Sequence, residues 1–518
     1  MKKLSLSNSR IEYLTILLLV VFRICIQIIL YKNGFLSITA DEFGRVIQAA
    51  EWSQDPYASW SGMWLPFYMY LFGAALKVYW NLLWVPRGIV IVCGLLSIFI
   101  MYLLTKQLFN DSRVALVSAT LFSLNPAFIW LSSTPLTEMP YSLLILAFLW
   151  LFVTYLGNQK RVYLFFSAFA LVLVNGFRFE AWLITGIFSA FLMGSQMMQL
   201  LSKKSLRTNE IILGVTAIIP WIFPCTWIIG NYLETGDPFF MLSAIKTYKL
   251  TFYGQDISYL NYWNTFLKLD PYLTISGVIA LFFCVWQNKK SSFVLFYGVV
   301  VLLPLIGFIF LHGGQVEPQG NYLRYLAPFT FTFYPAFGFL INRISTFFSK
   351  TKLLSTILLS LMLGVITWTQ IQTTLDFVND PASDGVAVGL KIKELREKNP
   401  ELARQPVLIE LSYWQYLAIQ IGANDVKDIL YDREPDMATR KSQSLLLSDL
   451  DAFKACISEY DISYIVVKQP ELQNIVESKL HLQPSKIVNN YSFYSVAPDM
   501  WKDTIETHAI CPLLAHNW

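Results

Sequence analysis

Long apolar segments, separated by short polar connections, constrain this chain more than any other feature of its sequence. With a window of about 19 residues we predict about eleven membrane-spanning helices. They are expected at residues 12–31, 86–105, 113–132, 138–156, 162–177, 180–198, 211–230, 271–288, 292–311, 325–342 and 353–371. A backbone in lipid must satisfy its own hydrogen bonds, so each segment is expected to be helical. The predicted fold is an α-helical polytopic membrane protein.

The composition agrees with a membrane protein and excludes one class of partner. Hydrophobic residues make up 55% of the chain and charged residues only 14%, whereas soluble proteins carry about 25% charged residues. A net charge of +4 is too small to indicate nucleic-acid binding. The partners that we expect are therefore the lipid bilayer and substrates in or near it.

Lysine and arginine predict the orientation, because loops that stay on the cytoplasmic side are enriched in both. Alternate connections contain them: Lys2, Lys3 and Arg10; Lys106 and Arg113; Lys160 and Arg161; Lys203, Lys204 and Arg207; Lys289 and Lys290; Arg343, Lys350 and Lys352. We therefore expect a cytoplasmic N-terminus and a multi-pass protein of the plasma (inner) membrane. No small-residue cleavage signal follows the first segment, so it is predicted to be retained as a helix.

Two regions are predicted to lie outside the membrane on the extracytoplasmic side. The first outer loop, 32–85, is rich in Trp and Tyr and is interrupted by Pro66, which is typical of helices lying in the membrane interface. Residues 372–518 have an ordinary soluble composition, with an amphipathic helix at 390–397 and buried strands at 407–411 and 464–467. We predict a transmembrane domain at 1–371 and a small extracytoplasmic α/β domain at 372–518.

The six cysteines show no spacing typical of a zinc site. Cys456 and Cys511 would be able to pair if their domain lies in an oxidising compartment, and the unpaired form remains the alternative.

An acidic pair, Asp41-Glu42, opens the first outer loop, and Arg45 follows it. If this stretch is helical, Asp41 and Arg45 share a face. Charge so close to a membrane boundary indicates a functional site. The alternative is a solvated cluster of loop charges.

Three further outer connections contribute charged candidates. Thr137 and Glu138 precede one span, where the alternative to a site role is capping of the next helix. Arg178 and Glu180 lie in a very short hairpin, where the alternative is a surface ion pair. Arg324-Tyr325 is expected at a helix start.

These residue types suit transfer of a group from an anionic lipid. A carboxylate next to a hydroxyl can act as a general base. Arginine matches phosphate and offsets the charge that develops on a leaving phosphate. Interfacial aromatic residues suit a lipid-linked substrate. Transfer of a sugar from a polyprenyl phosphate would use all three features.

The order of several motifs resembles the GT-C membrane glycosyltransferases, in particular the branch of protein O-mannosyltransferases and the aminoarabinose transferase of lipid A. The resemblance covers about residues 10–345. It rests on the following stretches: Asp41-Glu42; Trp64-Leu65-Pro66-Phe67-Tyr68; Trp84-Val85-Pro86-Arg87-Gly88; Thr137-Glu138-Met139-Pro140; Arg178-Phe179-Glu180-Ala181-Trp182; and Arg324-Tyr325-Leu326-Ala327-Pro328.

The resemblance implies an inverting transfer from a polyprenyl-phosphate sugar to an extracytoplasmic lipid, glycan or protein. Asp41 would be the catalytic base and Glu42 would orient it or the acceptor. The donor phosphate and substrate would be bound by Arg45, Glu138, Arg178, Glu180, Arg324 and Tyr325. No cofactor is expected, with a divalent cation as the alternative.

Two functions from other classes remain as alternatives. A transporter or flippase for a lipid-linked substrate would keep ionisable residues at helix centres, where this chain has mainly Arg23. A membrane scaffold with an exterior binding domain would not need arginines and carboxylates at its outer helix ends. The sequence identifies neither the sugar nor the acceptor.

Overall fold

The computed structural model describes residues 3–202, 208–253, 258–289, 291–312, 319–347, 351–375, 382–399, 405–410, 415–432, 444–497, 500–501 and 511. The chain forms two compact units. The first comprises Met1–Asn33, Tyr57–Tyr68 and Arg87–Val378, and the second comprises Gly34–Pro56, Met69–Pro86 and Asn379–Trp518.

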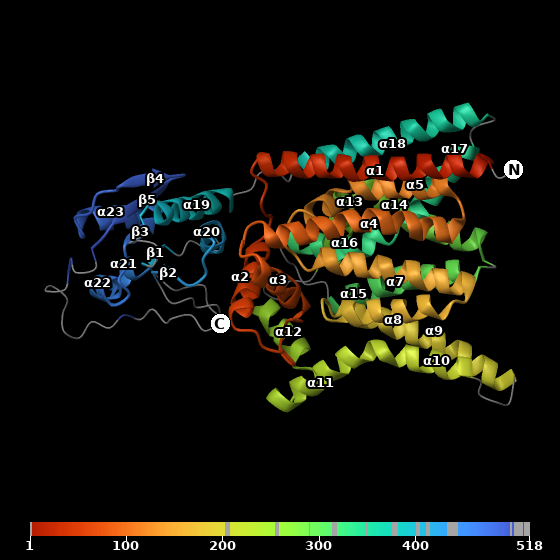
Figure 1. The fold of residues 1–518 in the computed structure, drawn as a ribbon, viewed down its shortest axis with the longest axis horizontal. Helices are drawn as coiled ribbons and strands as arrows, with labels where there is room; N and C mark the ends of the chain where they lie inside the picture. The colour runs from red at the N-terminus through yellow and green to blue at the C-terminus, as the bar shows by residue number, and fades with distance from the viewer. Residues whose placement is uncertain are drawn as a thin grey trace. The chain divides into compact units, whose positions relative to one another are not determined.

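The first unit is a bundle of helices, many of which run side by side (Figure 1). They are α1 (Lys3–Lys32), α4 (Val85–Phe109), α5 (Ser112–Leu124), α6 (Pro126–Leu131), α7 (Glu138–Asn158), α8 (Arg161–Asn175), α9 (Glu180–Ser202), α10 (Thr208–Ile218), the 3-10 turn η1 (Ile219–Trp221), α11 (Ile222–Thr235), α12 (Phe240–Tyr253), α13 (Leu260–Leu269), α14 (Pro271–Gln287), α15 (Ser292–His312), α16 (Gln319–Phe331), α17 (Tyr334–Phe347) and α18 (Lys352–Leu375).

The bundle contains helices that are long and apolar enough to cross a membrane. Within the described residues these are Glu12–Lys32, Val85–Phe109, Glu138–Asn158, Ile211–Thr235, Ser292–Phe310 and Leu353–Thr374. Shorter apolar helices accompany them. The chain is thus a mostly helical membrane protein, and each predicted apolar segment is helical, while the count of about eleven spans stays a prediction.

Three of the predicted segments are not single helices, and proline explains each break. Residues 113–132 divide into α5 and α6 at Asn125-Pro126, and 325–342 divide into α16 and α17 just before Pro335. The segment 211–230 is interrupted by η1, which contains Pro220. Proline lacks a backbone N–H and clashes with the carbonyl four residues earlier, so an unbroken helix is unfavourable there.

A buried polar network joins the two breaks at Asn125 and Tyr334. The Asn125 Nδ2 group donates to the Tyr334 hydroxyl at 2.8 Å, and that hydroxyl donates to Asp270 Oδ2 at 2.8 Å. Gln370 Nε2 on α18 donates to the same oxygen at 3.0 Å. All four side chains are buried. The network therefore fixes α5, α14, α17 and α18 against one another around the interrupted backbones.

Arg23 on α1 is buried within the bundle rather than directed towards the membrane surface. Its Nη2 donates to the Ile129 carbonyl at 2.9 Å and to Ser132 Oγ at 2.5 Å. The Tyr31 hydroxyl donates to the Ser133 carbonyl at 2.5 Å. The Arg23 guanidinium lies at the C-terminal end of α6, where the helix dipole favours a positive charge. This intramembrane arginine thus anchors the chain just ahead of Glu138.

The second unit combines helices with one mixed β-sheet. Its helices are α2 (Asp41–Gln54), α3 (Phe67–Val78), α19 (Ala382–Lys398), α20 (Gln415–Ala423), α21 (Leu445–Ser448), α22 (Leu450–Glu459) and α23 (Pro470–Ser478). Its strands are β1 (Val407–Ile409), β2 (Ile429–Tyr431), β3 (Tyr464–Val467), β4 (Lys486–Val488) and β5 (Tyr491–Ser495).

The described strands follow the order β2-β1-β3-β5-β4. Strands β2, β1 and β3 are parallel, and β5 is antiparallel to β3 and β4. Because side chains alternate along a strand, Val407 and Ile409 pack with α19 and α20, and Leu408 packs with α21 to α23 on the other face. The expected small sheet with helices in the C-terminal region is confirmed, while the domain bounds 1–371 and 372–518 stay predictions. The predicted strand 464–467 is observed, but the strand expected at 407–411 ends at Ile409.

Helices α2 and α3 come from the predicted first outer loop, yet they lie in the second unit. α2 packs against α20. After α3, the Trp80 indole donates to the Asn424 carbonyl at 3.0 Å, and the Leu82 amide donates to Asn424 Oδ1 at 2.8 Å. Asn424 has φ 60°, a left-handed conformation that asparagine tolerates. The contacts therefore divide the 32–85 loop between the two units.

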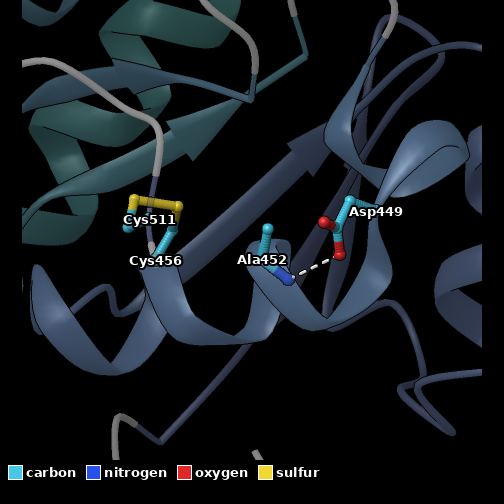
Figure 2. Close-up of a disulfide and its surroundings, with 4 residues drawn as sticks. All are labelled: Asp449, Ala452, Cys456 and Cys511. Atoms are coloured by element: carbon cyan, nitrogen blue, oxygen red, sulfur yellow. Dashed lines mark hydrogen bonds between the residues drawn. A yellow bond between two sulfur atoms is a disulfide. The ribbon is translucent and has the colours of Figure 1, made fainter. Parts of the chain in front are cut away.

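Figure 2 shows the disulfide between Cys456 on α22 and Cys511 near the C-terminus. Asp449 caps the same helix by accepting a hydrogen bond from the Ala452 amide at 2.9 Å. Of the two alternatives left by the sequence, the structure contains the paired form.

Candidate functional site

The acidic pair begins α2, so the condition under which Asp41 and Arg45 share a face is met. Asp41 is half-buried, and Arg45 lies four residues on, on the same face. Glu42 is fully buried. Its carboxylate accepts hydrogen bonds from the Ile38 amide at 2.9 Å and from the Thr39 amide and hydroxyl, both at 2.6 Å. Glu42 thus organises the turn before the helix and fixes the backbone from which Asp41 projects.

A second charged group lies in the first unit, where Arg178 joins two glutamates. Its Nη1 is 2.5 Å from Glu138 Oε1, and its Nη2 is 2.6 Å from Glu180 Oε1. Nε of Arg178 also donates to Glu180 Oε2 at 3.2 Å, which makes that pair bidentate. The exposed fractions of the three side chains are 11% for Arg178, 3% for Glu138 and 15% for Glu180. These residues form a largely buried ion-pair cluster.

Chain topology assembles this cluster. Glu138 is the first residue of α7 and Glu180 is the first residue of α9, so both carboxylates lie where a helix dipole favours negative charge. Arg178 lies in the short turn that links α8 to α9, and α8 packs against both α7 and α9. The hairpin therefore brings the arginine between the two helix starts.

Burial alone would lower the pKa of Arg178, but the charges of Glu180 and Glu138 outweigh it and raise that pKa above its ordinary value. The guanidinium therefore stays charged. Removing it would leave two largely buried carboxylates near each other without the charge of Arg178, which is unfavourable.

Aromatic rings and a second arginine complete the cluster. The guanidinium carbon of Arg178 is 5.2 Å from the ring centre of Tyr325 and 5.9 Å from that of Tyr141. The guanidinium of Arg324 lies 4.8 Å from the same Tyr325 ring, and its Nη2 donates to the Tyr325 hydroxyl at 2.9 Å. Both distances to Tyr325 lie in the range of a cation–π contact. Helix α16 thus adds Arg324 and Tyr325 to the glutamates and arginine of α7 to α9.

The structure contradicts two of the alternatives considered for these residues and one expectation. Thr137 makes no capping bond to the backbone of α7, and its hydroxyl instead donates to Glu138 Oε2 at 3.1 Å. The Arg178–Glu180 pair exists, but it is largely buried and shared with Glu138 rather than being a surface pair. Arg324 lies inside α16, which begins five residues earlier at Gln319.

Sequence reasoning missed Tyr141 as a member of the cluster. It follows Glu138 by three residues on α7, and residues three apart on a helix are neighbours, so the spacing alone would have indicated it. It also missed the Asp270 network, because no local signal shows that two proline breaks far apart in the sequence meet.

The ion pairs of the cluster fix two carboxylates in place. Arg178 holds Glu138 and Glu180 in fixed positions, which leaves their remaining oxygen lone pairs suited to accept hydrogen bonds from hydroxyl groups. Arg178 and Arg324, which both contact the Tyr325 ring, remain the predicted phosphate ligands. Over the part of the chain that the structure describes, no group of three or more His, Cys, Asp or Glu could hold a metal ion. Independence from metal stays a prediction.

Comparison with known proteins found one family model that matches part of the sequence and several solved structures with a similar fold. A family model described as dolichyl-phosphate-mannose-protein mannosyltransferase matches residues 64–227, which include Glu138, Arg178 and Glu180. No curated protein sequence matches the chain significantly.

Among solved structures, ArnT from Cupriavidus metallidurans bound to undecaprenyl phosphate superposes with a TM-score of 0.58 at 10% identity, over 92% of this chain and 97% of ArnT. The archaeal oligosaccharyltransferase AglB from Archaeoglobus fulgidus, in complex with an inhibitory peptide and a dolichol-phosphate, gives a TM-score of 0.54 at 14% identity. That match covers 88% of this chain and 69% of AglB. The resemblance to the GT-C glycosyltransferases is confirmed at the level of the fold.

Proposed function

We propose that this membrane protein with a GT-C fold is a glycosyltransferase, which moves one sugar from a polyprenyl-phosphate donor to an extracytoplasmic acceptor. One observation carries the proposal: the largely buried Glu138–Arg178–Glu180 cluster, with Arg324 and Tyr325 beside it, is built on the helices of this fold. A bare scaffold has no need for an ion-pair cluster that is nearly excluded from water, because such clusters are weak contributors to stability.

The donor class follows from the chemistry and is supported by the similar proteins. Arginine with a tyrosine hydroxyl suits a phosphate monoester or diester oxygen. Two proteins with similar folds were solved with undecaprenyl phosphate and with a dolichol-phosphate. A polyprenyl phosphate is therefore the leaving group that we assign.

The orientation that we propose places the cluster on the extracytoplasmic side. Glu138 begins α7, and Lys160 and Arg161 follow at its other end. Basic residues are retained on the cytoplasmic side, so the Glu138 end faces outward, in a plasma (inner) membrane. The disulfide between Cys456 and Cys511 agrees with a second unit outside the cytoplasm, where disulfides persist.

The mechanism that we propose is a single displacement with inversion. The Asp41 carboxylate takes the proton from an acceptor hydroxyl as its oxygen bonds to the anomeric carbon of the donor sugar. The bond from that carbon to the phosphate oxygen breaks, and the polyprenyl phosphate leaves with the electron pair. Glu42 fixes the helix start that presents Asp41, and Arg45 on the same face assists in binding. Arg324 offsets the charge on the leaving phosphate.

The proposal is tested with purified full-length protein and a panel of radiolabelled polyprenyl-phosphate sugars. We expect one donor to lose its label when crude membrane acceptor is present. Asp41→Asn should lower the rate at least about 10²-fold, the contribution typical of a general base, without changing the thermal unfolding profile. Gln48→Ala, an exposed position on the same helix, is the matched control. Full activity of Asp41→Asn would rule out the base assignment, and no loss from any donor, with or without divalent ions, would contradict the proposed reaction.

A further inference from the structure

A cavity in the first unit lies away from the ion-pair cluster and has no role in the proposed reaction. It has a volume of about 330 Å³ and is bounded by α1, α5 and α18. On α5 it is lined by Leu116, Val117 and Thr120, and on α18 by Leu359 and Leu363. This volume is at the lower end of the range for ligand sites. The size and the apolar walls suit a hydrocarbon chain.

The charged end of the cavity is formed by Glu12 and Arg113. Glu12 is already neutralised, because its carboxylate lies 2.6 Å from Lys106 Nζ and accepts from the Tyr102 hydroxyl at 2.5 Å. Arg113 donates to Ser355 Oγ at 3.1 Å, and no carboxylate in the described part of the chain forms an ion pair with it. The charge of this half-buried arginine thus remains available to an anion at the end of the apolar cavity.

The cavity faces the bilayer rather than the bundle core. α5 packs against both α1 and α18, so it forms the floor between them, and Figure 1 shows α1 and α18 along one side of the bundle. The outward positions Leu17 on α1 and Leu361 on α18 are 57% and 62% exposed, as expected for side chains that contact lipid. An occupant can therefore enter sideways from the membrane.

Arg113 lies at the basic ends of the helices, and this position indicates which class of lipid the cavity binds. α5 and α6 separate Arg113 from Glu138, so the cavity opens at the helix ends opposite the cluster. Lys106, Lys160 and Lys352 also lie at these ends. Basic residues at a membrane surface attract anionic lipid head groups, by about 1 kcal/mol for each Lys or Arg.

We infer that this cavity is a binding site for an anionic glycerophospholipid. One acyl chain lies along Leu116, Val117 and Leu359, and the head-group phosphate meets Arg113. The site is separate from the proposed donor site, and the inference stands whether or not the protein transfers a sugar.

The test uses delipidated, full-length protein in detergent and native mass spectrometry, with phosphatidylglycerol and phosphatidylcholine of identical acyl chains as probes. We expect phosphatidylglycerol to bind more tightly. Arg113→Gln should weaken its binding about fivefold, the equivalent of one such charge, and leave phosphatidylcholine unchanged. Lys160→Gln, which removes an exposed charge at the same helix ends but away from the cavity, is the matched control.

A second variant, Leu359→Trp, fills the cavity and should prevent binding of both lipids. If that variant does not fold, Arg113→Gln decides alone, because it changes a residue at the cavity mouth. Equal binding of the two lipids, or an Arg113→Gln protein with an unchanged preference, would overturn the inference. Undecaprenyl phosphate is added as a third probe, and its displacement of phosphatidylglycerol in an Arg113-dependent manner would show that the site belongs to the isoprenoid lipid instead.

Discussion

At the residue scale, the two arginines of the cluster differ in what their removal should do. Arg178 bridges two largely buried carboxylates at 2.5 and 2.6 Å, so its loss would disrupt the structure as well as any activity. Arg324 contacts the Tyr325 ring and hydroxyl. Arg324→Ala therefore tests the predicted phosphate role, and thermal unfolding of the same variant separates that role from an effect on folding.

We expect Arg324→Ala to raise the KM for the lipid donor about 10- to 100-fold, since a hydrogen bond to a charged group contributes about 1.5–3 kcal/mol. The value of kcat should fall less. Steady-state kinetics over a range of donor concentrations gives both values. Arg324→Lys should recover part of the affinity because it keeps the charge but not the forked geometry. Arg343→Ala, at an exposed position on α17, is the control, and an unchanged KM in Arg324→Ala would exclude the phosphate role.

The raised pKa of Glu51 on α2 predicts that the stability of the second unit depends on pH. Burial raises its pKa to about 7, above its ordinary value of 4.5, and the groups facing it include Tyr431, which contacts Tyr416. The fold favours the protonated form, so the contribution of Glu51 to stability is fully present below about pH 4.5 and is lost as the pH rises through about 7.

Glu51→Gln mimics the protonated form and should flatten this dependence. We expect the variant to match wild type at pH 5 and to melt a few degrees higher at pH 8, as measured by thermal unfolding across that range. Gln54→Ala, which removes an exposed uncharged side chain from the same helix, should keep the wild-type pH profile. Parallel profiles for Glu51→Gln and wild type would disprove the assignment.

At the scale of elements, close backbone contact decides how α19 and α20 pack. A Cβ atom added at Gly389 would collide with the Ile419 carbonyl, and one added at Gly422 would collide with the Val386 carbonyl. Two helices approach this closely only where glycine removes the side chain. The sheet face formed by Val407 and Ile409 is covered by this helix pair.

Gly389→Ala and Gly422→Ala should therefore each destabilise the second unit by about 1–3 kcal/mol, the usual effect of overpacking. Limited proteolysis of residues 379–518 and thermal unfolding would detect the change. Gly364→Ala on α18, where nothing lies within 4 Å of the added atom, should be neutral or slightly stabilising. Wild-type stability in both test variants would refute the close contact.

At the scale of the whole molecule, one disulfide links parts of the chain that are 55 residues apart. Closing a loop of that length lowers the entropy of the unfolded chain, which corresponds to roughly 4 kcal/mol in the loop-entropy treatment. The C-terminal segment depends on this link because the Cys511 side chain packs into the core beside α22.

We expect the Cys456→Ser/Cys511→Ser double variant to unfold its second unit at a lower temperature and to be cleaved sooner near the C-terminus. A reducing agent should shift wild type to the same extent and leave the double variant unchanged. Replacing Cys225, a free and exposed cysteine, with Ser is the control. If reduction has no effect on wild type, the disulfide does not contribute to stability.

The sequence by itself determined the helical membrane fold, the small α/β region near the C-terminus and the residues of the cluster other than Tyr141. Apolar length, the period of strand burial and charge at helix ends are local, so a single pass along the chain detects them. Asp41, Glu138, Arg178 and Arg324 were named from their positions alone.

Only the tertiary structure decided which of these residues meet and what each contacts. In the structure, the Glu42 carboxylate accepts a hydrogen bond from the turn at Ile38–Thr39. Arg178 forms ion pairs with both glutamates, and Tyr141 lies beside its guanidinium. Helix α2 also packs against α20 although more than 350 residues separate them. Contacts of this kind depend on the energy of packing between distant segments, and no local pattern encodes that energy.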